Sequence, residues 1–211
     1  MLRWALLPLT LAAAAPALAE AQVEALGDLK LYRVPMRVNV AAQAQKQVAM
    51  LVQPAASFER VYLLDAAGAV LTGRTVRPTP FELRARNVET QGLGVPLPAG
   101  TVALFARRAG RELLAGEAPI DDLAVGEKIS LPFGESPDVT WTRTLVAQSE
   151  RGEQWRIDSN SARTTAVKAE LTLPFGIKGT PAGAHRSERG WILPFDLPAN
   201  EARSFTYFAE K

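Results

Sequence analysis

Residues 166–173 have the sequence AVKAELTL, and residues 81–88 have the sequence FELRARNV. In both stretches apolar and polar side chains alternate. The apolar positions are Val167, Ala169, Leu171 and Leu173 in the first stretch and Phe81, Leu83 and Ala85 in the second. The polar positions are Lys168, Glu170 and Thr172 in the first and Glu82, Arg84 and Arg86 in the second. A period of two is typical of a β-strand with one buried face, so both stretches predict strands.

Similar short runs recur along the chain. They lie at residues 48–52, 61–64, 102–106, 139–146, 155–158, 191–195 and 205–208. The 15 prolines argue against long helices. Turn residues at 65–68 (DAAG) and 108–111 (RAGR) predict two hairpin turns. Short strands separated by frequent turns predict an all-β protein of antiparallel sheets.

The best candidate boundary between domains is the segment 134–138, GESPD, which is rich in turn-forming residues. We therefore expect two small antiparallel β-sandwich domains of immunoglobulin-like type, packed together, at residues 28–137 and 138–211.

The first nineteen residues have the layout of a secretory signal peptide. Arg3 supplies a positive charge, residues 5–15 are apolar, and Ala17-Leu18-Ala19 forms a small-x-small cleavage site before Glu20. The apolar stretch is shorter than the roughly 18 to 20 residues that a membrane-spanning helix needs. We expect a cleaved signal peptide at residues 1–19 and a soluble, periplasmic or secreted product.

The composition excludes several kinds of functional site. The chain has no cysteine, which excludes disulfides, thiolate catalysis and cysteine-ligated metal centres. With 24 basic and 22 acidic residues the formal net charge is +2. A nucleic-acid partner is not expected, because proteins that bind nucleic acid concentrate Lys and Arg on one face.

Residues 87–134, NVETQGLGVPLPAGTVALFARRAGRELLAGEAPIDDLAVGEKISLPFG, resemble the bacterial family known as DUF4139, a domain of unknown function. The matching features are Asn87 at a strand end, the loop 92–100, Gly116-Glu117 and Gly126-Glu127. The resemblance covers most of residues 30–140 and corresponds to the carboxy-terminal region of the family, whose larger members carry a further extracytoplasmic segment before it. It implies a β-rich envelope protein and supplies no catalytic residues.

The loop 92–100, GLGVPLPAG, has its own physical interpretation. Gly92 and Gly94 permit backbone angles that other residues disfavour, while Pro96 and Pro98 restrict theirs. The loop should be stiff. We expect Leu93, Val95 and Leu97 to cap the core, and favour this role over ligand binding.

Catalytic candidates are few. A Ser-His-Asp arrangement would need His185, the one histidine, as its base. The serines considered are Ser136, Ser159 and Ser187. No G-x-S-x-G motif is present, and residues 183–190 predict a polar turn that holds His185 in solvent. Asp121 and Asp122 are the adjacent acidic pair, but no calcium-loop pattern surrounds them.

Exposed Trp rings could instead stack on sugars. Trp141, Trp155 and Trp191 all lie in alternating runs, however, so burial in the core is the favoured interpretation.

We therefore expect no catalytic, cofactor-binding or metal-binding residues and no cofactor. The predicted function is a non-enzymatic interaction or structural module that binds an unidentified envelope protein. The alternatives are a carbohydrate-binding module and a carboxylate-dependent hydrolase of envelope polymers. Converging acids in a cleft would favour the hydrolase, a planar Trp platform the sugar binder, and an exposed apolar patch the protein binder.

Overall fold

The computed structural model describes residues 22–26, 29–33, 39–40, 42–43, 45, 51–53, 55–68 and 76–211. The chain forms two compact units, Met1–Pro54 and Ala55–Lys211. In the first unit, β1 (Gln22–Leu26) and β2 (Leu29–Arg33) pair antiparallel. The expected signal peptide and most of the run 48–52 lie outside the described residues. Within the described part of the chain, no helix has the length and apolarity to cross a membrane.

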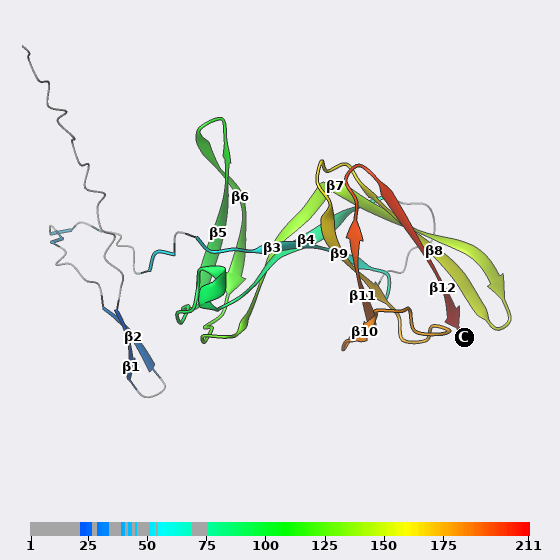
Figure 1. The fold of residues 1–211 in the computed structure, drawn as a ribbon, viewed down its shortest axis with the longest axis horizontal. Coiled ribbons are helices and arrows are strands. Elements are labelled where there is room, and N and C mark those ends of the chain that lie inside the picture. Colours follow the sequence, from blue (N-terminus) through cyan, green and yellow to red (C-terminus); the bar gives the residue numbers. More distant parts are fainter. Residues whose placement is uncertain are drawn as a thin grey trace, which may run out of the picture. The chain divides into compact units, whose positions relative to one another are not determined.

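The second unit contains an eight-stranded sheet with the order β10-β11-β9-β3-β4-β7-β8-β12 (Figure 1). In chain order its strands are β3 (Glu59–Asp65), β4 (Arg77–Arg86), β7 (Lys128–Ser149), β8 (Gly152–Ser161), β9 (Val167–Leu173), β10 (His185–Arg186), β11 (Trp191–Leu197) and β12 (Ala202–Glu210). A separate two-stranded sheet joins β5 (Gly100–Arg108) and β6 (Arg111–Ile120). The expectation of a β-protein is confirmed.

The large sheet is mixed, which corrects the expectation of purely antiparallel sheets. β3 and β9 run parallel, with Tyr62 opposite Ala169 and Leu64 opposite Leu171. A tight hairpin can join only antiparallel strands. β3 and β9 are distant in sequence, so no hairpin constrains their relative direction.

The segment 134–138, expected as a domain boundary, lies inside β7. This strand has 22 residues and pairs with β4 through Lys128–Trp141 and with β8 through Val139–Ser149. The ladder with β4 shifts register near Pro78 and again near Pro80, and Gly134 on β7 has a φ of 97°. The turn-forming residues therefore produce an irregularity that bends a continuous strand.

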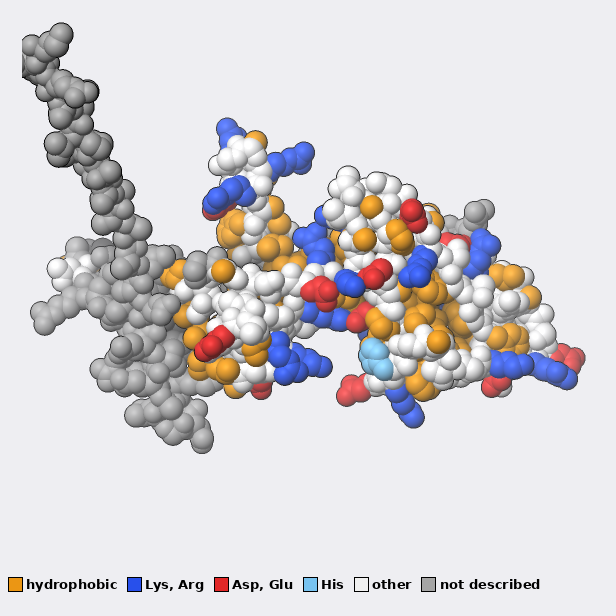
Figure 2. All heavy atoms as spheres, viewed as in Figure 1, with side chains coloured by type: hydrophobic (Ala, Val, Ile, Leu, Met, Phe, Trp, Pro, Cys, Tyr) orange, Lys and Arg blue, Asp and Glu red, His pale blue; other side chains and the backbone are white. Residues whose placement is uncertain are grey.

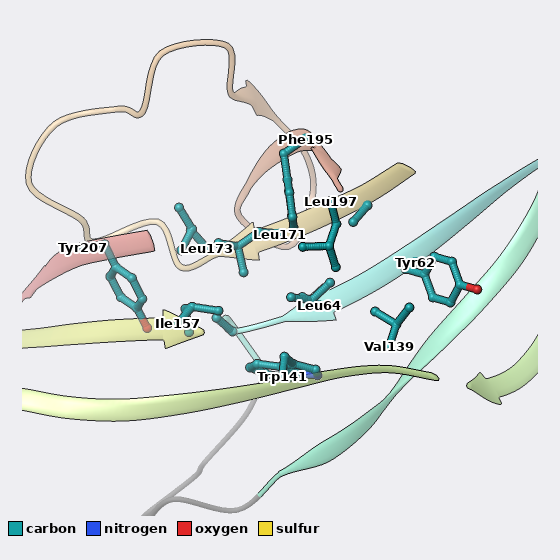
Figure 3. Packing of buried hydrophobic residues seen from close by; sticks show 12 residues of the cluster. Tyr62, Leu64, Val139, Trp141, Ile157, Leu171, Leu173, Phe195, Leu197 and Tyr207 are labelled. Atoms are coloured by element: carbon teal, nitrogen blue, oxygen red, sulfur yellow. The ribbon is translucent and has the colours of Figure 1, made fainter. Parts of the chain in front are cut away.

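Two clusters of buried hydrophobic residues hold this unit together. The first comprises Tyr62, Leu64, Ala66, Val139, Trp141, Ile157, Ala169, Leu171, Leu173, Phe195, Leu197 and Tyr207 (Figure 3). The second comprises Leu93, Ala118, Ile129, Leu131 and Phe133. The predicted inward positions of residues 166–173 pack in the first cluster or against it, and those of residues 81–85 pack against the second. The alternation therefore predicted correctly which face of each strand is buried.

The turn at residues 108–111 is confirmed as the connection between β5 and β6. Ala109 and Gly110 have φ values of 49° and 76°, the pair of positive values that a two-residue type I′ hairpin turn requires. The Asp65 side chain accepts hydrogen bonds from the backbone N–H groups of Ala67 (3.1 Å) and Gly68 (2.9 Å). β3 then leads to its antiparallel neighbour β4 through residues 66–76, of which 69–75 lie outside the described part.

Candidate interaction surface

The β5–β6 hairpin packs on the second cluster through its base alone. Val102 and Leu104 of β5 and Ile120 of β6 lie against that cluster, and Ala118 is part of it. Beyond Leu104 the ladder shifts by one residue, and the strands continue away from the cluster with every residue exposed. Figure 1 shows this distal part projecting from the large sheet.

The distal part of the hairpin exposes large apolar side chains. Phe105, Leu113 and Leu114 are 56%, 52% and 57% exposed. Phe105 pairs with Leu114, while Leu113 pairs with Ala106 in the next row of the ladder. Successive rows point to opposite faces of a β-ribbon, so both faces of this ribbon are apolar. A sheet that faces water on one side normally has a polar outer face. This exposure makes the distal part of the hairpin a candidate contact surface.

Arginines occupy the tip of the hairpin. Arg108 and Arg111 lie opposite each other beside the turn, and Arg107 pairs with Glu112 in the adjoining row. The Arg107–Glu112 ion pair has an N–O distance of 2.8 Å and is well exposed. Figure 2 shows Lys and Arg side chains gathered at the end of the hairpin, beyond hydrophobic side chains on its stem. The tip therefore carries excess positive charge.

A mainly apolar groove of about 380 Å³ lies at the base of β5. Its lining includes Phe58, Leu97, Val102, Ile120 and Leu131. The groove and the apolar ribbon lie along the same strand, β5.

Asn87 fixes the structure beneath the hairpin. It is fully buried at the end of β4. Its side-chain amide donates to the carbonyl oxygens of Val95 (2.7 Å) and Ala124 (2.9 Å), and its side-chain oxygen accepts from the N–H of Gly94 (3.0 Å). Its backbone N–H also donates to the Glu127 carbonyl at 2.8 Å. One side chain thereby joins the loop 92–100 to the turn after β6.

The loop 92–100 supports the core through two of the three residues expected to cap it. Leu93 is buried in the second cluster and Leu97 packs against it, while Val95 is half-buried outside the cluster. Gly92 and Gly94 have φ values of 73° and 90°, in the region that favours glycine. Leu97 and Leu123 exchange backbone hydrogen bonds of 2.9 Å each.

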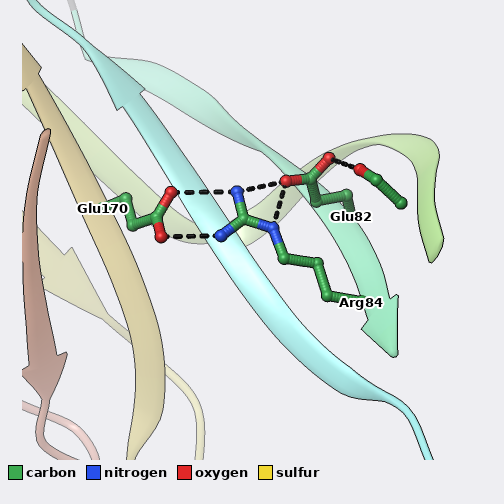
Figure 4. Close-up of polar contacts among 4 residues, drawn as sticks. Glu82, Arg84 and Glu170 are labelled. Carbon is green, nitrogen blue, oxygen red and sulfur yellow. Dashed lines mark hydrogen bonds and ion pairs between the residues drawn. The ribbon is translucent and has the colours of Figure 1, made fainter. Parts of the chain in front are cut away.

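A charged network crosses the outer face of the large sheet (Figure 4). From β4, the Arg84 guanidinium reaches over β3 and donates two hydrogen bonds, of 2.6 and 2.9 Å, to Glu170 of β9. Arg84 also forms an ion pair with Glu82, whose other oxygen accepts from the Ser130 hydroxyl. Hydrogen bonding to Glu170 is the largest cause that raises the pKa of Arg84 above its ordinary value.

The serine candidates lie on different segments of the chain. His185 is exposed on β10, Ser136 is buried on β7, and Ser159 is buried on β8. The Ser159 hydroxyl donates to the Arg203 carbonyl (3.0 Å) and the Ser187 hydroxyl to the Gly190 carbonyl (2.9 Å). Among the described residues, no hydrogen bond joins any of these serines to His185.

The aspartate pair has a structural contact. Asp121 and Asp122 are both exposed, and Asp122 accepts a hydrogen bond from the Ala99 N–H (2.9 Å), directly before β5. Over the described ranges, no group of three or more His, Cys, Asp or Glu side chains has an arrangement that could hold a metal ion.

The three tryptophans contribute to the first cluster. Trp141 is buried within it, and Trp155 and Trp191 are half-buried against it. The Arg143 guanidinium lies 3.9 Å from the ring centroid of Trp155 and covers part of that ring. Core packing, the interpretation favoured for these residues, is confirmed for Trp141.

No family model, curated protein or solved structure matches this chain. The resemblance to DUF4139 stays a prediction.

Proposed function

We propose that this protein is a non-enzymatic interaction module of the bacterial envelope, and that it binds an envelope protein through the β5–β6 hairpin. The observation that carries the proposal is the exposure of Phe105, Leu113 and Leu114 on the two faces of a projecting ribbon. Large apolar side chains lose unfavourable contact with water when a partner covers them.

The arginines at the tip suit the same role. Arg and aromatic side chains are enriched among the residues that dominate binding energy at interfaces. Phe105 lies two residues from Arg107, so one strand presents an aromatic anchor and a charged donor together. The positive tip would speed encounter with an acidic partner and select against basic ones.

The hydrolase and the sugar binder have less support from the geometry. The acids that converge on the sheet face, Glu82 and Glu170, are both paired with Arg84. Of the three candidate tryptophans, Trp141 is buried, Trp191 is half-buried against the first cluster, and Trp155 is partly covered by Arg143. The acids therefore do not form an unpaired cluster in a cleft, and the tryptophans do not form a planar exposed platform.

The envelope location rests on the amino-terminal sequence. The cleavage pattern Ala17-Leu18-Ala19 predicts release of a product that begins at Glu20. Mass spectrometry of the protein from the extracytoplasmic fraction should find Glu20 at its amino terminus. Recovery of the protein only from the cytosol, with Met1 in place, would contradict the location.

The binding role is tested by crosslinking in intact cells with a triple variant, Phe105→Ser, Leu113→Ser and Leu114→Ser. The normal protein should yield a reproducible protein adduct, and the variant should lose it while its unfolding temperature stays within a few degrees. Leu145→Ser with Val146→Ser is the matched control, because these apolar side chains are also exposed but lie on β7. The proposal fails if the triple variant keeps the adduct, or if the protein is captured only by purified peptidoglycan or polysaccharide.

A further inference from the structure

We infer that the free edge of β5 pairs antiparallel with β5 of a second copy of this chain. The inference rests on the proposed function, because it names a partner for the same hairpin. A strand at the edge of a sheet presents unpaired N–H and C=O groups, which accept another strand unless the edge is protected.

The two edges of the hairpin differ in how well they are protected against pairing with another strand. On β6, Pro119 lacks a backbone N–H, the ladder irregularity opposite Phe105 interrupts regular pairing, and the base contacts β7. On β5, the residues 100–106, GTVALFA, contain neither proline nor a charged side chain. In the described part of the chain, β6 is the only strand that pairs with β5. The unprotected edge therefore belongs to β5.

The side-chain positions along β5 are also uncrowded. A Cβ atom placed on Gly100 would meet no atom of the described residues within 4 Å. Thr101, Ala103 and Phe105 are all exposed. Neither the Gly100 position nor these three side chains is covered by described residues, so the side chains of an added strand would find room beside them.

The charges at the two ends of β5 are opposite. Arg107 and Arg108 lie at its end, while Asp121 and Asp122 lie beside its start, where Asp122 binds the Ala99 N–H. Antiparallel pairing of two copies places the basic end of each strand beside the acidic end of the other. Both contacts form at once, because a two-fold interface repeats every contact. A parallel arrangement would bring the arginines of the two copies together.

One register of the two β5 strands places opposite charges together and also places a large side chain opposite a small one. With Arg108 opposite Gly100 of the second copy, Leu104 lies opposite its own equivalent and Phe105 lies opposite Ala103. The large ring then meets a small side chain. Phe105 and Leu114 share a face of the hairpin, so pairing brings these two side chains and their equivalents onto one face of a four-stranded sheet.

Sedimentation equilibrium of the purified protein measures this association. The protein should form dimers in a concentration-dependent manner. Ala103→Lys should make it monomeric over the same concentrations, because a lysine guards an edge against pairing. Ala115→Lys is the matched control, since Ala115 is also exposed but lies on β6. A protein that stays monomeric at millimolar concentration, or an Ala103→Lys variant that still dimerises, would overturn the inference.

A charge exchange tests the orientation of the strands. Arg108→Glu and Asp121→Arg should each lower the association constant about tenfold, because each replaces an attraction with a repulsion. The double variant should recover it, since the two introduced side chains have opposite charges and would meet across the interface. If the double variant associates no better than either single variant, the antiparallel arrangement is wrong.

The two proposals fail separately. A monomeric protein whose hairpin still yields the cellular adduct would overturn the pairing of β5 and leave the proposed function standing. A dimer that persists while the Phe105, Leu113 and Leu114 variant keeps its cellular adduct would overturn the proposed function alone.

Discussion

The side-chain oxygen of Asn87 accepts a hydrogen bond from the backbone N–H of Gly94, at a distance of 3.0 Å, inside the fold. The same side chain donates to two carbonyl oxygens on different segments. The base of the exposed hairpin is therefore held by a buried amide and not by apolar packing alone. Unpaired polar groups in a protein interior lower stability, so loss of this side chain should lower the free energy of unfolding.

Replacement of Asn87 by Ala should lower the free energy of unfolding by about 2–4 kcal/mol, because three hydrogen bonds disappear and their backbone partners stay buried. Urea unfolding measures the difference. Asn160→Ala is the control, since Asn160 is exposed on β8 and should change stability little. Equal stability of the two variants would show that the Asn87 contacts contribute nothing.

The network around Arg84 should contribute more to the free energy of unfolding than the ion pair at the hairpin tip. Arg84→Ala leaves two half-buried carboxylates without their cation, and we expect a loss of about 1–3 kcal/mol. Arg107→Ala removes an exposed pair and should cost less than about 1 kcal/mol. Chemical unfolding of both variants decides the order, and an equal or reversed cost would contradict it.

Tyr207 should make the protein less stable in alkali. Burial raises the pKa of its hydroxyl above the ordinary value of 10.0, so the folded state holds this proton more tightly than the unfolded state. The contribution is complete below about pH 10 and is lost as the pH rises through the folded-state pKa. Tyr207→Phe should therefore lose less stability than the normal protein as the pH rises above about 10. The free energy of unfolding of both proteins is measured as a function of pH. An equal fall for the two proteins would contradict a role for the Tyr207 hydroxyl.

Replacement of an apolar residue in the core beneath the hairpin should lower stability more than replacement of one at the end of the hairpin. Leu131 is buried in the second cluster, and Leu131→Ala should cost about 2–4 kcal/mol through the cavity that it leaves. Leu113→Ala should change stability by less than about 0.5 kcal/mol, because Leu113 is 52% exposed. Thermal unfolding distinguishes the two. A large loss from Leu113→Ala would assign that side chain to the fold instead of to binding.

Alternation predicted the strands well because it reports one physical fact, the burial of every second side chain. It placed Phe81, Leu83 and Leu171 on the correct faces. It could not reveal that β3 and β9 are parallel, since pairing between distant strands leaves no local trace. The turn-forming residues at 134–138 lie inside β7, because glycine and proline also permit bends within a strand.

The candidate site was only partly visible in the sequence. Asn87 occupies the next inward position after Phe81, Leu83 and Ala85, so a polar residue on a core-facing position was the available signal for its role. The exposure of Phe105 and Leu114 could not be predicted, because alternation in residues 102–106 is the same whether the outer end of the hairpin is covered or free.

Binding through the β5–β6 hairpin can be measured directly by site-specific photocrosslinking in intact cells. A photoreactive amino acid is placed at one position at a time, at Phe105 or Leu113 on the hairpin and at Leu145 or Phe175 elsewhere, all of them exposed. We expect a protein adduct of constant size from the hairpin positions and none from the others. Adducts from Leu145 or Phe175 without any from Phe105 or Leu113 would contradict it.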